Sequence, residues 1–203
     1  MRNLIVTAFI TLDGVVQAPG GPGEDEDGGF PHGGWTVPFF DEHLGEVMGA
    51  FMGKPFDLLL GRRTYDIFAA FWPTASEADG AQPLNDATKY VASRGRPSLA
   101  WERSVLLEGD VAQAVTALKQ SDGPELQVHG SGDLVQTLLR HDLVDEWQLI
   151  TFPVVLGQGK RLFGDGAVPT TLRLVSSSVS GTGVVVTRYV AAGELRTGTF
   201  SPA

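Results

Sequence analysis

The chain has 203 residues, of which 42% are hydrophobic, and it carries 24 acidic against 15 basic side chains, a formal net charge of −9. This length predicts a single domain, and the hydrophobic content is sufficient for a packed core. The lack of cysteine excludes disulfides, thiolate nucleophiles and cysteine-based zinc or iron–sulfur sites. The scattered basic residues argue against nucleic-acid binding, and no apolar stretch approaches the roughly 18 residues of a membrane span. We therefore expect a soluble, cytoplasmic protein with a small-molecule partner, and neither a nucleic-acid nor a membrane partner.

The N-terminal region combines a buried strand with a long loop. Residues 4–12 form a nearly continuous run of apolar and β-branched side chains, typical of a strand that is covered on both faces. Residues 18–34 are rich in glycine and include four consecutive acids at 24–27, which predicts a mobile loop. A loop of this length in a compact domain is more often a lid or a binding loop than a simple connection.

The rest of the chain alternates between strand and helix patterns, and polar sequence at 74–86 predicts turns. Further strands are predicted at 56–60, 89–93, 104–107, 125–129, within 144–155, and at 171–177 and 183–190; helices are predicted at 41–54, near 65–69, at 111–118 and at 132–139. The alternation predicts an α/β sandwich around a mostly parallel sheet, and the last two strands predict an antiparallel hairpin at its edge. We expect one domain over 1–190 and a tail over 191–203.

The segment Gly61–Thr64 follows a buried strand and begins a helix. The first backbone N–H groups of a helix have no partner inside it, and they lie at the positive end of the helix dipole. Two neighbouring arginines, Arg62 and Arg63, would add charge that suits a phosphate. The alternative is a strand-terminal glycine followed by solvated arginines and a threonine N-cap, and the residues alone favour neither.

A second such turn is His129–Asp133. It is a weak relative of the dinucleotide-binding fingerprint, because Gly130 and Gly132 have the expected spacing while Val135 stands in place of the third glycine. His129, Ser131 and Asp133 do not form a hydrolase triad, since they lie on one turn without the nucleophile elbow. The four histidines lack paired metal-ligand spacing and the acids at 24–27 lack the EF-hand pattern, so no metal site is expected.

Several segments, taken in order, carry a resemblance to a known family. They are Thr11–Gly14, Leu60–Tyr65, Val91–Arg94, Val128–Asp133, Leu143–Glu146 and Pro153–Gly159. Their order resembles the dihydrofolate reductase-like superfamily, and more closely its branch that contains the reductase domain of the bifunctional riboflavin-biosynthesis deaminase-reductase. The resemblance covers about residues 3–190. It implies a dihydrofolate reductase-like three-layer sandwich, with the loop at 18–34 in the position of the mobile active-site loop.

The resemblance also implies an NADPH-dependent reductase. By analogy, the cofactor-binding residues are Gly61, Arg62, Arg63 and Thr64 for the phosphates, Ser93 and Arg94 beside the adenosine 2′-phosphate, and Gly130, Ser131, Gly132 and Asp133 for the pyrophosphate at a helix N-terminus. An arginine near a ribose phosphate favours NADPH, whereas NADH would favour a carboxylate there.

The substrate side departs from the folate-reducing relatives. In those relatives a Trp-x-x-Pro segment leads into the first helix, which carries an acid that hydrogen-bonds the heterocycle. Here Trp35–Pro38 is followed by two phenylalanines and then Asp41, so Asp41 is either the displaced acid or an ordinary N-cap. In the riboflavin branch the substrate carries a ribose phosphate, and the turn at Asp13 lies near its site. The implied substrate-binding residues are Asp13, Trp35 and Asp41, and the implied proton source is Asp13, Asp41 or a bound water.

The sequence thus predicts an NADPH-dependent reductase of a small nitrogen heterocycle, of the type that reduces 5-amino-6-(5-phosphoribosylamino)uracil. The alternatives are a ligand-binding module with the same fold and no reductase activity, or a reductase of an unrelated substrate. No deaminase domain is expected, because its zinc ligands would need cysteines. The apolar strands near 144–155 and at the C-terminal hairpin predict a homodimer.

Overall fold

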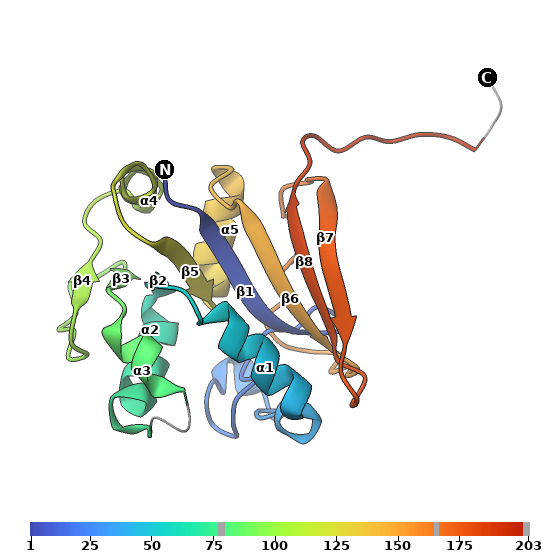
Figure 1. The fold of residues 1–203 in the computed structure, drawn as a ribbon, viewed down its shortest axis with the longest axis horizontal. Helices are drawn as coiled ribbons and strands as arrows, with labels where there is room; N and C mark the ends of the chain where they lie inside the picture. The colour runs from blue at the N-terminus through green and yellow to red at the C-terminus, as the bar shows by residue number, and fades with distance from the viewer. Residues whose placement is uncertain (77–79, 165–166, 201–203) are drawn as a thin grey trace.

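The computed structural model describes residues 1–76, 80–164 and 167–200. Within these residues, eight strands form one sheet in the order β4-β3-β2-β5-β1-β6-β8-β7 (Figure 1). The strands are β1 (Leu4–Thr11), β2 (Phe56–Gly61), β3 (Lys89–Ala92), β4 (Ser104–Leu106), β5 (Glu125–His129), β6 (Glu146–Phe152), β7 (Leu172–Val179) and β8 (Val185–Ala191). The predicted fold class is confirmed, with six parallel strands and an antiparallel C-terminal hairpin.

Helices cover both faces of this sheet. They are α1 (Glu42–Phe51), α2 (Arg62–Phe71), α3 (Ala81–Asp86), α4 (Val111–Gln120) and α5 (Gly132–Arg140), with short 3-10 turns at 27–29, 37–39 and 72–74. On one face, Leu4, Val6 and Ala8 of β1 pack with residues of α4 and α5. On the other face, α1 covers β6 and β8 through Leu44, while α2 and α3 cover β2 and β3. This arrangement is the three-layer sandwich that the sequence predicts.

Strand β1 lies at the centre of the sheet, between β5 and β6. Its continuous apolar sequence is explained by this position, because seven of its eight residues are buried by the helices on the two faces. The pairs Thr7–His129 and Thr11–Phe152 show its register with β5 and β6. The parallel strands therefore end at one edge of the sheet, where the connecting loops gather.

One local prediction is wrong. The segment 74–86 was predicted as turns, but its last part forms α3, in which Ala81 and Leu84 are buried. The helix has six residues, too few for a clear periodic pattern, and its hydrophobic contacts come from α2 and β2. Residues 77–79 of the predicted turn lie outside the described residues.

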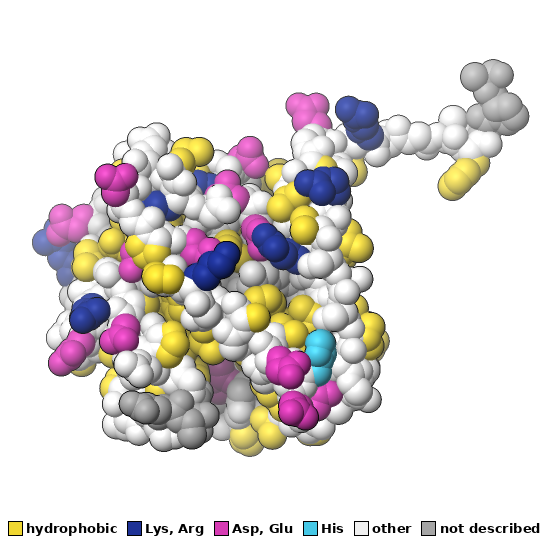
Figure 2. Space-filling view, viewed as in Figure 1, with side chains coloured by type: hydrophobic (Ala, Val, Ile, Leu, Met, Phe, Trp, Pro, Cys, Tyr) yellow, Lys and Arg dark blue, Asp and Glu magenta, His cyan; other side chains and the backbone are white. Residues whose placement is uncertain are grey.

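The C-terminal part begins with the hairpin of β7 and β8, which has an irregularity between Leu174 and Ser176. After β8, residues 192–194 are still hydrogen-bonded to Thr171, and residues 195–200 then extend away from the sheet, as Figure 1 shows. The last three residues of the predicted tail, 201–203, are outside the described part. On the face in Figure 2, Lys and Arg side chains stand singly among acidic ones and form no continuous basic stripe.

Candidate functional site

Two strand-to-helix turns are bound to one another at the carboxyl edge of the sheet. The backbone N–H of Gly61, at the end of β2, donates to Ser131 Oγ over 2.9 Å. In return, the backbone N–H of Ser131 donates to Thr64 Oγ1 over 3.0 Å. These reciprocal bonds bring the N-terminal ends of α2 and α5 together, although the two turns are about 70 residues apart in the chain.

The backbone of the second turn has an unusual conformation. Gly130 and Ser131 both have positive φ values, 54° and 55°. A Cβ atom on Gly130 would lie 3.3 Å from Thr64 Oγ1, so glycine permits the close approach of the turns. Gly132, by contrast, has no atom within 4 Å of the position of a Cβ. The position of a side chain at Gly132, at the start of α5, is therefore open.

The two neighbouring arginines have separate partners. Both carboxylate oxygens of Asp66 lie 2.7 Å from Arg62 Nε, one turn along α2. Arg63 instead contacts the acidic loop, with Nη2 at 3.0 Å from Asp25 Oδ1 and Nη1 at 2.9 Å from Asp27 Oδ2. Of these two arginines, Arg63 is therefore the one that forms ion pairs with a distant part of the chain.

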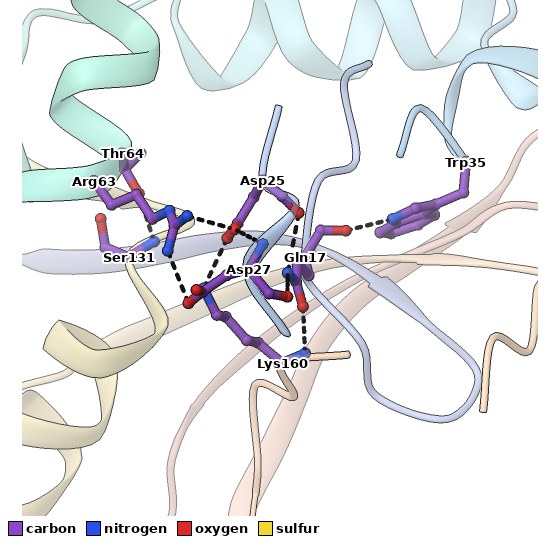
Figure 3. Close-up of polar contacts among 8 residues, drawn as sticks. All are labelled: Gln17, Asp25, Asp27, Trp35, Arg63, Thr64, Ser131 and Lys160. Carbon is purple, nitrogen blue, oxygen red and sulfur yellow. Dashed lines mark hydrogen bonds and ion pairs between the residues drawn. The ribbon is translucent and has the colours of Figure 1, made fainter. Parts of the chain in front are cut away.

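Lys160 completes this group of charges. Its ammonium lies 2.9 Å from a carboxylate oxygen of Asp25 and 2.9 Å from one of Asp27 (Figure 3). We call Asp25, Asp27, Arg63 and Lys160 the ionic cluster. The hydrogen bond and charge of Lys160, followed by Arg63, lower the pKa of Asp27. Sequence reasoning missed Lys160, because a single lysine after Gly159 gives no local signal.

Gln17 holds the acidic loop in place. Its amide nitrogen donates to the backbone oxygens of Asp25 and Asp27, at 3.0 and 2.9 Å, and its amide oxygen accepts from the backbone N–H of Lys160. The Gln17 side chain is buried, and its backbone oxygen accepts from the Trp35 indole (Figure 3). The loop predicted to be mobile is thus hydrogen-bonded to the body of the protein.

Ser93 and Arg94 follow β3 at the same sheet edge, since Ala92 pairs with Gly61. Ser93 Oγ accepts from the Gly95 N–H at 3.2 Å, and Arg94 is exposed. The structure therefore places all three predicted cofactor-binding segments on neighbouring strands in the order β3, β2, β5. Their role in binding a cofactor stays a prediction.

Asp13 follows β1 and fastens the segment after β6. Its carboxylate accepts from the Thr11 hydroxyl at 2.6 Å and from the backbone N–H groups of Leu156 and Gly157. The Thr11 bond, with the two backbone bonds, lowers the pKa of Asp13 to about 2. These contacts favour a positioning role for Asp13 over that of a proton donor.

Trp35 and Asp41 also have structural contacts. Trp35 is buried, donates its indole N–H to Gln17, and packs edge-on against Phe152 at 5.4 Å between ring centroids. Asp41 is the N-cap of α1, and its Oδ1 accepts from the Leu44 N–H at 3.0 Å, which lowers the pKa of Asp41. Of the two alternatives for Asp41, the N-cap is the one that the geometry shows; the substrate-binding role of both residues stays untested.

A polar row on β5 was not singled out from the sequence. Glu125, Gln127 and His129 alternate with buried apolar residues and face α1, where Gln127 Nε2 donates to the Phe51 carbonyl and to Glu125. The Gln127 oxygen is therefore the acceptor for His129 Nε2 at 3.1 Å, which leaves His129 Nδ1 as an acceptor. Burial lowers the pKa of His129 to about 4, so the ring is neutral at pH 7. The alternation of polar residues in a central strand was the available signal.

A shallow pocket of about 290 Å³ lies beside the ionic cluster. It is lined by Gln17, Asp27, Gly28, Phe30, Gln158, Gly159 and Lys160. In the part of the chain that the structure describes, no group of three or more histidine or acidic side chains could hold a metal ion. Across those same residues, no helix is both long and apolar enough to cross a membrane.

Comparisons with known proteins agree with this architecture. The chain is 27% identical over 192 residues to the uncharacterized protein YyaP of Bacillus subtilis, covering 93% of this chain and 94% of that protein. It is 29% identical over 187 residues to YwjB of the same organism, covering 90% and 95%.

Two solved structures share the fold. A Shewanella sp. PV-4 protein named for riboflavin biosynthesis matches with a TM-score of 0.71 at 22% identity, over 94% of this chain and 99% of that one. A pyrimidine reductase-like protein from Corynebacterium diphtheriae matches with a TM-score of 0.61 at 15% identity, over 95% and 93%. The model of the RibD C-terminal domain matches residues 2–186. The chain therefore belongs to the RibD C-terminal domain family.

Proposed function

We propose that the protein is an NADPH-dependent reductase of a small nitrogen heterocycle, similar to the reductase of 5-amino-6-(5-phosphoribosylamino)uracil. The observation that carries this proposal is the pair of joined turns. Their reciprocal bonds place the N-terminal ends of α2 and α5 next to each other, with Arg63 beside them. Helix N-termini and guanidinium groups are the usual partners of phosphate in proteins.

The residues of the two joined turns fit the phosphates of a dinucleotide. The N–H groups of Gly61 and Ser131 are already bonded within the protein, so they are not available. The remaining first-turn N–H groups of both helices have no intrahelical partner. No atom lies within 4 Å of the Cβ position of Gly132, so a ligand could approach the start of α5 from that side. In this proposal Arg63 adds charge, Asp133 lies in the first turn of α5, and Ser93 and Arg94 flank the 2′-phosphate.

Once bound, the nicotinamide supplies a hydride for an imine or carbonyl carbon. The protein binds and orients the cofactor and the substrate, and it excludes water from them. In this proposal the neutral Nδ1 of His129 accepts from an N–H group of the ligand. Asp13 and Asp41 both have lowered pKa values and are ionised at neutral pH, so neither carries a proton to deliver. We therefore assign proton delivery to a bound water.

Titration of the purified protein with NADPH and, separately, with NADH tests the proposal. We expect NADPH to bind at least tenfold more tightly than NADH, and Arg63→Ala and Arg94→Ala each to weaken NADPH binding about tenfold, as the loss of a charged phosphate contact would. Arg173→Ala, on exposed β7, is the matched control and should not change the affinity. Absence of binding by either nucleotide would overturn the proposal.

A second candidate is a ligand-binding module without reductase activity. The observation that favours it is that Asp13 and Asp41, the two carboxylates implied for catalysis, are both bonded to backbone N–H groups. Oxidation of NADPH in the presence of a panel of pyrimidines, pterins and quinones separates the two functions. Turnover of any of these compounds supports the reductase, whereas binding of NADPH without turnover supports the module.

The exposed edge of the sheet supports a further part of the proposal, a homodimer. Strand β7 is the last strand on its side of the sheet, and Leu174, Val175 and Val179 are exposed on it. Unpaired edge strands with apolar side chains commonly pair with another chain. Light scattering at micromolar concentration should give the mass of a dimer, and a monomer would contradict this part.

A further inference from the structure

The ionic cluster places two carboxylates on the arginine that the proposed function assigns to a phosphate. Asp25 and Asp27 contact different nitrogens of the Arg63 guanidinium, at 3.0 and 2.9 Å, and Lys160 bridges the same two carboxylates from the other side (Figure 3). Two positive and two negative side chains thus neutralise one another. The polar hydrogens with which Arg63 would grip a phosphate are directed at the loop instead.

The buried side chain of Gln17 supports this arrangement. Gln17 is buried and binds the backbone oxygens of both acids, so it positions Asp25 and Asp27 together. Gln17 also accepts from the N–H of Lys160, which brings the second cation to the same place. A chance contact between a flexible acidic loop and a surface arginine would have no such buried support.

The contact is nevertheless of a kind that a ligand can replace. The side chains of Arg63, Asp27 and Lys160 are 54%, 55% and 45% exposed, whereas that of Asp25 is 11% exposed. The exposed ion pairs of Asp27 contribute little to stability because water and salt screen them. A pyrophosphate carries two negative charges on closely spaced oxygens, and it offers a guanidinium a bidentate partner in the same position.

We propose that Asp25 and Asp27 act as an internal anion that competes with the cofactor phosphate for Arg63. This inference rests on the proposed function, because it takes Arg63 as a phosphate-binding residue. Binding of the dinucleotide exchanges the two carboxylates for a phosphate and releases the acidic loop, residues 20–29. The apparent affinity is then reduced by the fraction of molecules in which the loop occupies Arg63.

The test uses the full chain with the variant Asp25→Asn/Asp27→Asn, titrated with NADPH by nicotinamide fluorescence. We expect the double variant to bind NADPH at least fivefold more tightly than the wild type. Glu26→Gln is the matched control, since Glu26 is an exposed neighbour without an ion pair among the described residues, and its affinity should stay within twofold of the wild type. The difference in NADPH affinity between the double variant and the wild type should be smaller at 0.5 M NaCl, because salt screens the ionic cluster.

Hydrogen exchange gives a readout that does not depend on activity. In the wild type, NADPH should increase exchange in residues 20–29; in the double variant, exchange there should be fast before any nucleotide is added. The proposed competition would be wrong if the double variant bound NADPH as tightly as the wild type or more weakly, or if NADPH protected the loop from hydrogen exchange. Either result would leave the proposed function standing. If neither the wild type nor the variants bind NADPH, the proposed function fails, and the competition fails with it.

Discussion

Two acidic groups at the same sheet edge hold the segment 153–160, and they do so differently. Asp13 accepts from the neutral backbone N–H groups of Leu156 and Gly157 in this segment, and from the Thr11 hydroxyl of β1. Its carboxylate also lies 3.5 Å from the Arg161 guanidinium just after the segment, and its side chain is 19% exposed. Asp25 and Asp27 bind its C-terminal end through the charged side chain of Lys160. The side chains of Asp27 and Lys160 are 55% and 45% exposed, while that of Asp25 is 11% exposed. Charge-neutral bonds to backbone make a fixed contact, whereas exposed ion pairs make an exchangeable one.

The largest expected loss of stability comes from a substitution within the segment 153–160, which both acidic groups hold. Gly159 has a φ of 121°, and a Cβ there would lie 2.7 Å from Val15 Cγ1 and 2.9 Å from Phe30 Cε2. We expect Gly159→Ala to lower the free energy of unfolding by about 2–4 kcal/mol, through overpacking and backbone strain together. Urea denaturation followed by tryptophan fluorescence measures it.

Gly157→Ala is the control for this variant. Gly157 also has a positive φ, 76°, but no atom lies within 4 Å of its Cβ position. Its substitution adds strain without a clash and should cost about 1–2 kcal/mol. Equal losses for the two variants would show that packing at Gly159 does not hold this segment.

A smaller loss is expected from Asp13→Asn. An amide cannot accept from three donors as strongly as a carboxylate, so we expect a loss of about 1–2 kcal/mol in the free energy of unfolding at pH 7. The folded pKa of about 2 lies below the ordinary value of 3.8. The ionised carboxylate therefore stabilises the fold above pH 3.8, and this contribution is lost as the pH falls towards 2.

Urea titrations at a series of pH values measure the free energy of unfolding of the wild type and of Asp13→Asn. The difference between these two free energies should become smaller below pH 3.8. Asp122→Asn, at an exposed site, is the control and should not change stability. A difference that stays constant between pH 5 and pH 2.5 would mean that Asp13 acts through packing rather than through its charge.

The smallest effect on stability is expected from Asp25→Asn/Asp27→Asn. The ion pairs of Asp27 are exposed and screened, so the loss should be smaller than that of Asp13→Asn and should decrease at 0.5 M NaCl. The Asp13→Asn loss, which depends mainly on neutral donors, should change less with salt. If the double variant lost more stability than Asp13→Asn, the ionic cluster would be a fixed contact and the comparison would be reversed.

The predictions from sequence were strongest where the signal is local. The continuous apolar run of β1 reflects burial on both faces, and the positions of α4 and α5 follow from a periodicity of 3.6 residues, which reflects burial on one face. The hairpin of β7 and β8 was predicted from the alternation in its sequence. The six-residue α3 was missed because its burial depends on α2 and β2, and so on contacts that its own short sequence does not encode.

In the candidate site, too, some features could be predicted from local sequence and others could not. The two glycine-containing turns at Gly61 and Gly130 could be found from sequence, because a strand followed by a helix start gives a local pattern. Their reciprocal bonds could not, since Thr64 and Ser131 meet only when β2 and β5 pair in parallel. Residue type suggested that Arg63 binds an anion, yet only the tertiary structure shows which anions contact it now.

By itself, the sequence determined the order of the strands and of all the longer helices, the family resemblance and the location of the two glycine-containing turns, because these depend on neighbours along the chain. The tertiary structure alone decided the partners of the charged side chains. Asp13 binds residues more than 140 positions away, and Asp25 joins Arg63 to Lys160. The physical reason is that the contacts of a charged side chain are set by the folded chain around it, and no periodicity records them.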